Sequence, residues 1–145
     1  MVVAASVIVG YMLLLAGLAV AAPGIGLGSL IELAPENWRD GAHVPAYGLL
    51  AWLVMWGLRR RDWPVIHAAW IGVLAAGVFG LWTEVAQGTA PGRDVSLQDV
   101  GNDLLGGMMA AAVMLLQKWA LSKSTDRLPL GQTYLRRLMK GTLSR

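Results

Sequence analysis

The chain of 145 residues contains no cysteine and few charged side chains, which make up 14% of the sequence. The lack of cysteine excludes a disulfide framework, a thiolate nucleophile and a cysteine-ligated metal. Such a low charge content, together with 56% hydrophobic residues and a mean hydropathy of +0.54, is untypical of a water-soluble globule. These absences indicate a membrane protein.

The sequence patterns of several familiar enzyme classes are also missing. The chain has no G-x-S-x-G, no H-E-x-x-H and no phosphate-cradling glycine loop, because the GIGLGSL segment follows an apolar run and not a strand. The pI of about 9.7 comes from basic residues that flank apolar segments, as they do in the cytoplasmic loops of membrane proteins. We therefore predict no nucleic-acid partner.

Four apolar runs are long enough to cross a bilayer as helices, which takes about 17–25 residues. They cover residues 2–22, 42–58, 65–87 and 97–121. The sequence AVAAP at 19–23 resembles a signal-peptide cleavage site, but the first run lacks a preceding Lys or Arg and is longer than a signal-peptide core, so we expect a retained helix. The predicted fold is an all-α polytopic membrane bundle of about four transmembrane helices.

Positive charges predict the orientation of this bundle, because cytoplasmic loops carry an excess of Lys and Arg. Ten of the twelve basic residues lie between the second and third runs, or in the last turn of the fourth run and beyond it; only Arg39 and Arg93 lie elsewhere. We therefore predict cytoplasmic termini and outward loops at about 23–41 and 88–96. A transmembrane domain at 1–121 is followed by a basic cytoplasmic tail at 122–145, either a helix on the inner leaflet or a solvated segment.

Unusual polar residues gather at the outward ends of the last three predicted helices. An ionisable side chain within a membrane span is costly, so such groups face the bundle interior or a cavity and have partners. In sequence order the polar residues are His43, Tyr47, Glu84, Gln87, Arg93, Ser96, Asp99, Asn102 and Asp103. We predict that they converge on one polar pocket on the extracytoplasmic side of the cell membrane.

The same residues belong to five separated elements, which read HVPAY, TEVAQ, PGR, SLQDVGND and LLGG. In this pattern the chain resembles the VanZ-like family, over residues 43–107. The family spacing S-x-x-D-x-x-x-N is one residue shorter here, so either Asn102 or Asp103 takes the last polar position. The resemblance implies a small bundle of membrane helices in the bacterial cell envelope and an association with low-level resistance to teicoplanin, but no defined reaction.

Three of these residues, His43, Glu84 and Asp99, are candidates for acid–base catalysis. Each has a structural alternative: a hydrogen-bonded histidine, a helix-linking contact for Glu84, and a helix cap for Asp99, which forms a capping-box pattern with Ser96. We assign no cofactor and no metal ligands, because the spacing matches no established metal motif. A divalent cation held by these three residues and Asp103 stays an open alternative.

The remaining residues are candidates for ligand binding. Arg93 offers five donors in a fork suited to phosphate or carboxylate, and its structural alternative is to neutralise Glu84 and Asp99. Asp103 lies too deep in its helix to act as a cap, so it needs a partner or a cavity. The others are Tyr47, Gln87, Ser96 and Asn102.

Three functions follow from this pattern as alternatives. The first is binding of a polar or anionic lipid headgroup or peptidoglycan precursor, with membrane lipids, a lipid-linked cell-wall precursor or a glycopeptide as partners. The second is an intramembrane enzyme that acts on a lipid-linked substrate. The third is a structural or accessory membrane subunit whose charges hold the bundle together.

Overall fold

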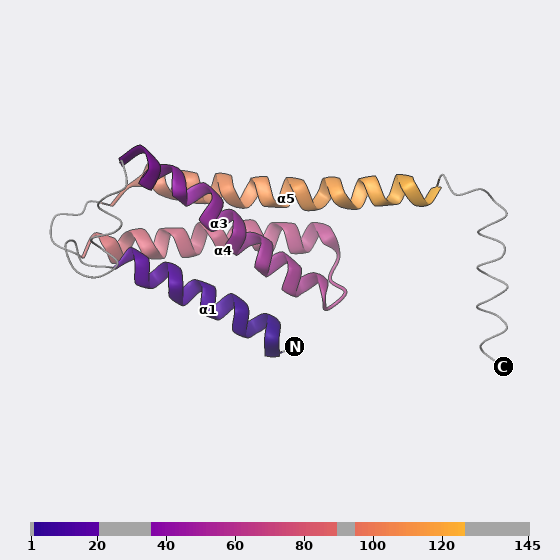
Figure 1. The fold of residues 1–145 in the computed structure, drawn as a ribbon, viewed down its shortest axis with the longest axis horizontal. Coiled ribbons are helices and arrows are strands. Elements are labelled where there is room, and N and C mark those ends of the chain that lie inside the picture. The colour runs from indigo at the N-terminus through magenta and orange to yellow at the C-terminus, as the bar shows by residue number, and fades with distance from the viewer. Residues whose placement is uncertain (1, 21–35, 90–94, 127–145) are drawn as a thin grey trace. The chain divides into compact units, whose positions relative to one another are not determined.

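The computed structural model describes residues 2–20, 36–89 and 95–126, and these form α-helices and connecting turns (Figure 1). The helices are α1 (Val2–Ala19), α3 (Glu36–Arg59), α4 (Val65–Gln87) and α5 (Leu97–Asp126), with no strand among the described residues. Each helix is long and apolar enough to cross a membrane. The predicted all-helical fold with four helices of spanning length is therefore confirmed.

Three helix boundaries differ from the predicted apolar runs by several residues. α1 ends at Ala19, before the predicted end at residue 22, and α5 continues past residue 121 to Asp126. α4 has the predicted bounds, whereas α3 begins at Glu36, so residues 36–41 are helical and the prediction of a loop there is wrong. Hydropathy detects only the part of a helix that suits hydrocarbon, and a helix continues past it wherever the backbone allows. The rest of the predicted outward loop, residues 23–35, and the tail from 127 lie outside the described residues.

The chain divides into two compact units, residues 1–115 and 116–145. All packing and site geometry below belong to the first unit.

The buried face of α4 includes a ladder of small residues at every fourth position. The ladder consists of Ala68, Gly72, Ala76 and Gly80, and Glu84 is the next residue in the same series. On α3, Met55 is fully buried and its side chain lies against Gly72. Small residues allow helix backbones to approach closely, and this packing is a main source of helix association in lipid.

The backbones of α3 and α5 also approach each other closely, at a pair of glycines. A methyl group placed on Gly48 would lie 3.1 Å from the carbonyl oxygen of Gly106. A methyl group on Gly106 would lie 2.9 Å from the Gly48 nitrogen and closer still to the carbonyl oxygen of Val44. Neither position has room for a larger residue, so the glycines set the distance between these helices.

Large apolar side chains point outward from the helices. Examples are Leu13 on α1, Val78 on α4 and Leu105 on α5, all exposed. The described helices expose many other large apolar side chains, and such a surface suits lipid as the surrounding medium. α1 adds a polar contact to the bundle, because the Tyr11 hydroxyl donates to the Ala46 carbonyl at 3.0 Å.

A short turn joins α3 to α4 at the end of the bundle that carries Arg59, Arg60 and Arg61. Asp62 lies there in the left-handed region, with φ of 58°, which aspartate tolerates better than most residues. The Arg59 guanidinium donates to the Trp63 carbonyl at 2.5 Å.

Candidate functional site

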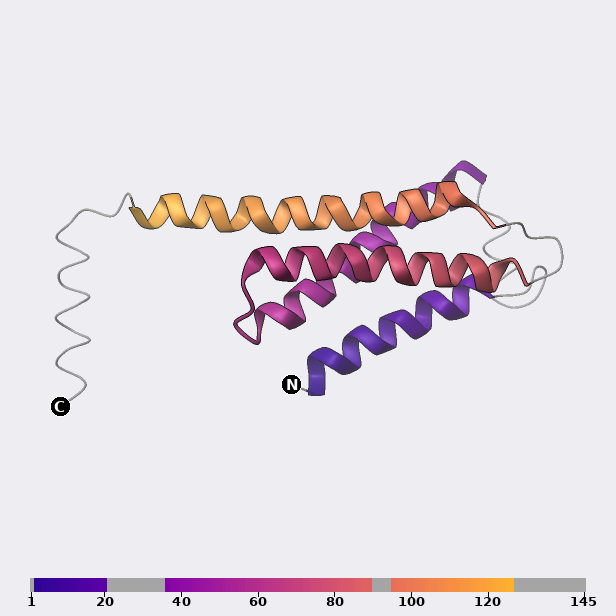
Figure 2. The same ribbon diagram turned by 180° about the vertical axis from the view of Figure 1, so that it is seen from behind.

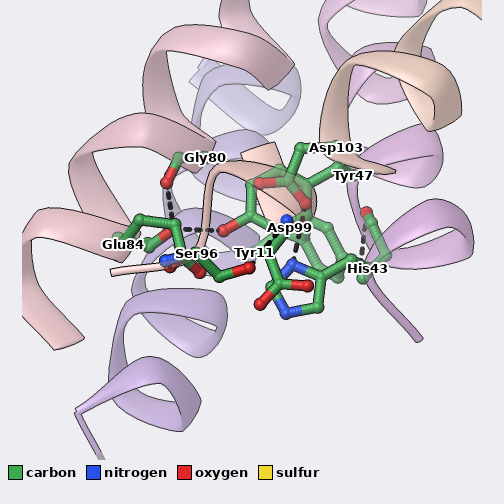
Figure 3. A network of polar contacts seen from close by, with 10 residues as sticks. Tyr11, His43, Tyr47, Gly80, Glu84, Ser96, Asp99 and Asp103 are labelled. Carbon is green, nitrogen blue, oxygen red and sulfur yellow. Dashed lines mark hydrogen bonds and ion pairs between the residues drawn. The ribbon is translucent and has the colours of Figure 1, made fainter. Parts of the chain in front are cut away.

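The start of α3, the end of α4 and the start of α5 meet at one end of the bundle (Figure 2). This end brings together side chains that are far apart in the sequence, as the close-up in Figure 3 shows. We define the polar cluster as His43, Tyr47, Thr83, Glu84, Ser96, Asp99 and Asp103. The predicted convergence thus has a structural counterpart in three helices.

The contact between His43 and Asp103 links α3 to α5. His43 Nδ1 lies 2.9 Å from Asp103 Oδ1. The Asp103 side chain is fully buried, whereas the His43 side chain is 20% exposed. An ionised Asp103 can only accept, so the ring then donates its Nδ1–H to the carboxylate, which fixes the ring and leaves Nε2 on its other side.

Tyr47 lies one helical turn below His43 and stacks on it, with ring centroids 5.8 Å apart. Its hydroxyl lies 2.5 Å from the Thr83 hydroxyl, which in turn lies 2.8 Å from the Gly80 carbonyl oxygen. Thr83 donates to Gly80, so the proton of the first hydrogen bond comes from Tyr47. The hydrogen bond between the Tyr47 and Thr83 hydroxyls therefore joins α3 to α4 one helical turn from His43.

Glu84 takes part in the cap of α5 although it belongs to α4. The Ser96 hydroxyl oxygen accepts the backbone N–H of Asp99 at 3.2 Å, as expected for an N-cap. In a capping box the acidic residue three positions on would accept the N–H of the cap residue. Here Glu84 Oε2 accepts that Ser96 N–H at 2.8 Å, so the Asp99 carboxylate is not needed for it.

Two buried carboxylate oxygens in the cluster have no hydrogen-bond partner among the described residues. They are Glu84 Oε1 and Asp103 Oδ2, and both side chains are fully buried. An unsatisfied buried polar atom costs about 1–3 kcal/mol, and more if it is charged. The cluster therefore has acceptor capacity that its own donors do not fill.

Other predicted site residues lie around this cluster or outside the described residues. Asn102 is half-buried on α5 and makes an interaction of its own, and Gln87 is half-buried at the end of α4. Asp103, not Asn102, is the α5 residue bonded to His43. Arg93 and its predicted contacts lie outside the described residues, and His67 is exposed at the opposite end of α4.

Two polar residues near this end of the bundle, Thr83 and Tyr11, are not among the predicted site residues. Thr83 stands directly before Glu84 in the TEVAQ segment, yet its burial and its bond to Tyr47 depend on the rotation of α4. Tyr11 was missed because it lies in the middle of an apolar run. A hydroxyl inside a predicted span was the available signal, since such a group needs an acceptor.

The cluster has two chemical capabilities. A histidine that is oriented by a carboxylate through Nδ1 presents Nε2 as a base or as a metal ligand. Atoms of His43, Glu84 and Asp99 also lie within 4.8 Å of one another, which suits the binding of one cation or of a donor-rich group.

No family model, curated protein or solved structure matches the chain.

Proposed function

We propose that the protein is a multi-pass membrane protein that binds the polar headgroup of an envelope lipid or lipid-linked cell-wall precursor at the polar cluster. In a VanZ-like protein such binding would lower susceptibility to teicoplanin-type glycopeptides. The observation that carries the proposal is the pair of buried, unsatisfied carboxylate oxygens on Glu84 and Asp103. A ligand that donates hydrogen bonds to them would remove their cost.

The charge of the cluster narrows the ligand chemistry. Its described side chains include three carboxyl groups, on Glu84, Asp99 and Asp103, and one imidazole, on His43. Such a set favours headgroups with N–H or O–H donors, for example an amine or a sugar. An anionic headgroup needs a compensating cation, which Arg93 is placed in the sequence to supply.

Lipid binding provides the direct test. Native mass spectrometry of the purified full chain should show preferential retention of phosphatidylethanolamine over phosphatidylcholine, because a quaternary ammonium has no N–H donor. Asp99→Asn should reduce that preference several-fold, since a bond to a carboxylate is about twice as strong as a neutral one. Equal retention of both lipids, or an unchanged preference in Asp99→Asn, would refute recognition of a donor-bearing headgroup.

His67→Gln is the matched control for this experiment. His67 is exposed at the opposite end of α4, so its replacement leaves the polar cluster intact. The lipid preference of this variant should equal that of the original chain. A loss in this variant as well would mean that the measured lipids bind elsewhere on the bundle.

A second candidate function is acid–base catalysis on a lipid-linked substrate. The bond from His43 to Asp103 favours it, because a carboxylate that holds Nδ1–H keeps Nε2 available as a general base. Glu84 and Asp99 lie close enough to share in the proton transfer. Release of a product from a lipid-linked sugar, lost in His43→Gln, would select this function over binding alone.

The proposed function places the polar cluster on the extracytoplasmic side, which cysteine labelling can test. The chain has no native cysteine, so single cysteines can be placed at Thr89, which follows α4, and at Ser124, near the end of α5. We expect an impermeant maleimide added to intact cells to label position 89 and not position 124. Labelling at 124 alone would reverse the orientation and put the cluster in contact with the cytoplasm.

A further inference from the structure

Three side chains from three different helices converge at the polar cluster with atoms suited to metal binding. His43 of α3, Glu84 of α4 and Asp99 of α5 each place a ligand atom within 4.8 Å of the other two (Figure 3). Glu84 is buried, and the other two are partly exposed. Three helices therefore contribute potential ligand atoms to one small region, and two of the three side chains are partly exposed there.

Glu84 provides the strongest indication of a ligand at this point. One of its oxygens, Oε2, accepts the Ser96 N–H at 2.8 Å, which holds the carboxylate in place. The other, Oε1, is buried and has no partner among the described residues. A fully buried, ionised carboxylate oxygen without a partner is costly, and a cation, a hydrogen-bond donor or a bound proton at this position would remove that cost.

His43 is held in the orientation that a metal ligand requires. Histidines that bind a metal usually donate their other ring N–H to a carboxylate or a carbonyl, and this fixes the tautomer. Asp103 accepts from Nδ1 in this way, at 2.9 Å. In the neutral imidazole, Nε2 then keeps its lone pair, on the side of the ring away from Asp103.

The cap of α5 does not use the Asp99 carboxylate, because Glu84 accepts the N–H of the cap residue Ser96. The Asp99 backbone N–H donates to Ser96 Oγ, whereas the Ser96 N–H goes to Glu84 and not to Asp99. A cap alone therefore explains the position of the Asp99 backbone. It does not explain why its carboxylate lies beside the imidazole of His43 and the carboxylate of Glu84.

We propose that His43, Glu84 and Asp99 bind one divalent cation of the Zn²⁺ or Mn²⁺ type. The charge of such an ion would balance the two carboxylates, and its bond to Glu84 would satisfy the buried oxygen. Three protein ligands leave at least one coordination position for water or for an oxygen of a ligand. The inference does not depend on lipid recognition and can be tested without any lipid.

The donor set determines the kind of metal. Imidazole nitrogen suits Zn²⁺ and other transition metals, whereas Mg²⁺ and Ca²⁺ prefer oxygen ligands only. Ligands of zinc lie about 2.0–2.2 Å from the ion, so ligand atoms up to 4.8 Å apart have to move toward one another to bind it together.

Metal binding to the purified full chain tests the proposal. The protein is prepared in detergent without a polyhistidine tag, stripped with a chelator and titrated with Zn²⁺, Mn²⁺, Mg²⁺ or Ca²⁺ by calorimetry. We expect about one equivalent of Zn²⁺ or Mn²⁺ per chain and binding of Mg²⁺ and Ca²⁺ that is weaker by about tenfold or more. Failure of both Zn²⁺ and Mn²⁺ to bind would overturn the proposal.

Variants assign the binding to these residues. Asp99→Asn, at a partly exposed position in the first turn of α5, should still fold and should weaken binding by at least about 10–100-fold. Glu84→Gln should do the same. His67→Gln removes the only other histidine of the chain, and Asp62→Asn removes an exposed carboxylate from a residue whose backbone suits asparagine.

These two control variants should bind as the original chain does. Binding that persists in Asp99→Asn and Glu84→Gln, or that disappears in His67→Gln, would locate the ion elsewhere and overturn the proposal. Because no lipid is present, these outcomes are independent of the lipid-retention experiment. If the chain binds Zn²⁺ but does not discriminate between lipids, the metal site is supported and the proposed lipid recognition is refuted.

Discussion

His43→Ala should destabilise the bundle by about 3–5 kcal/mol, because it removes the partner of a fully buried carboxylate. Asp103 Oδ1 would lose its bond to Nδ1, and Oδ2 already has no partner among the described residues. Both oxygens of a fully buried side chain would then be unsatisfied. The measurement is reversible unfolding in mixed micelles, with a chelator present to exclude any contribution from a bound cation.

The double variant His43→Ala/Asp103→Ala separates the pair from the general loss of packing. It should be more stable than His43→Ala alone, because the carboxylate that had lost its partner is gone. His67→Ala is the matched control and should change stability by no more than about 0.5 kcal/mol, as is usual for an exposed position. Equal stability of His43→Ala and His67→Ala would show that the contact with Asp103 contributes nothing.

The second large effect is expected at the contact between α3 and α5. Gly106→Ala should destabilise the bundle by about 1–3 kcal/mol, the usual cost of forcing a group into a well-packed site. The new methyl would meet the Val44 carbonyl and the Gly48 nitrogen, which are backbone atoms and cannot rotate away. The helices would have to separate, and His43 would move away from Asp103.

Gly101→Ala provides the comparison on the same helix. A methyl at Gly101 would meet nothing within 4 Å. At both positions, alanine has a higher helix propensity than glycine, by about 1 kcal/mol. The difference in unfolding free energy between the two variants therefore reports packing alone. If Gly106→Ala proved as stable as Gly101→Ala, the glycine pair would not set the distance between α3 and α5.

The fold could largely be predicted from hydropathy, because a membrane span must be apolar over a fixed length. α4 shows this best, with predicted bounds equal to the observed ones. The start of α3 could not be predicted in this way, since residues 36–41 are mostly polar and their helical state follows from continuation of the backbone.

Several members of the polar cluster could be predicted from the sequence, but Thr83 and the pairings could not. The ends of three predicted helices indicated that His43, Glu84, Asp99 and Asp103 lie close together, and the spacing of Ser96 and Asp99 indicated a cap. That Glu84 takes the Ser96 N–H, or that His43 selects Asp103, depends on how each helix is rotated about its axis. No local pattern in a single sequence encodes that rotation.

The small-residue ladder of α4 also affects how the bundle opens. Alanine and glycine have no rotamers to lose, so Ala68, Gly72, Ala76 and Gly80 can remain packed at no cost in side-chain entropy. Above them, His43, Glu84 and Asp103 each lose rotamer freedom when they are held in the cluster. Thermal fluctuations should therefore part the helices first at the polar end, with the ladder as the hinge, and amide hydrogen exchange should be faster near Glu84 than near Gly72.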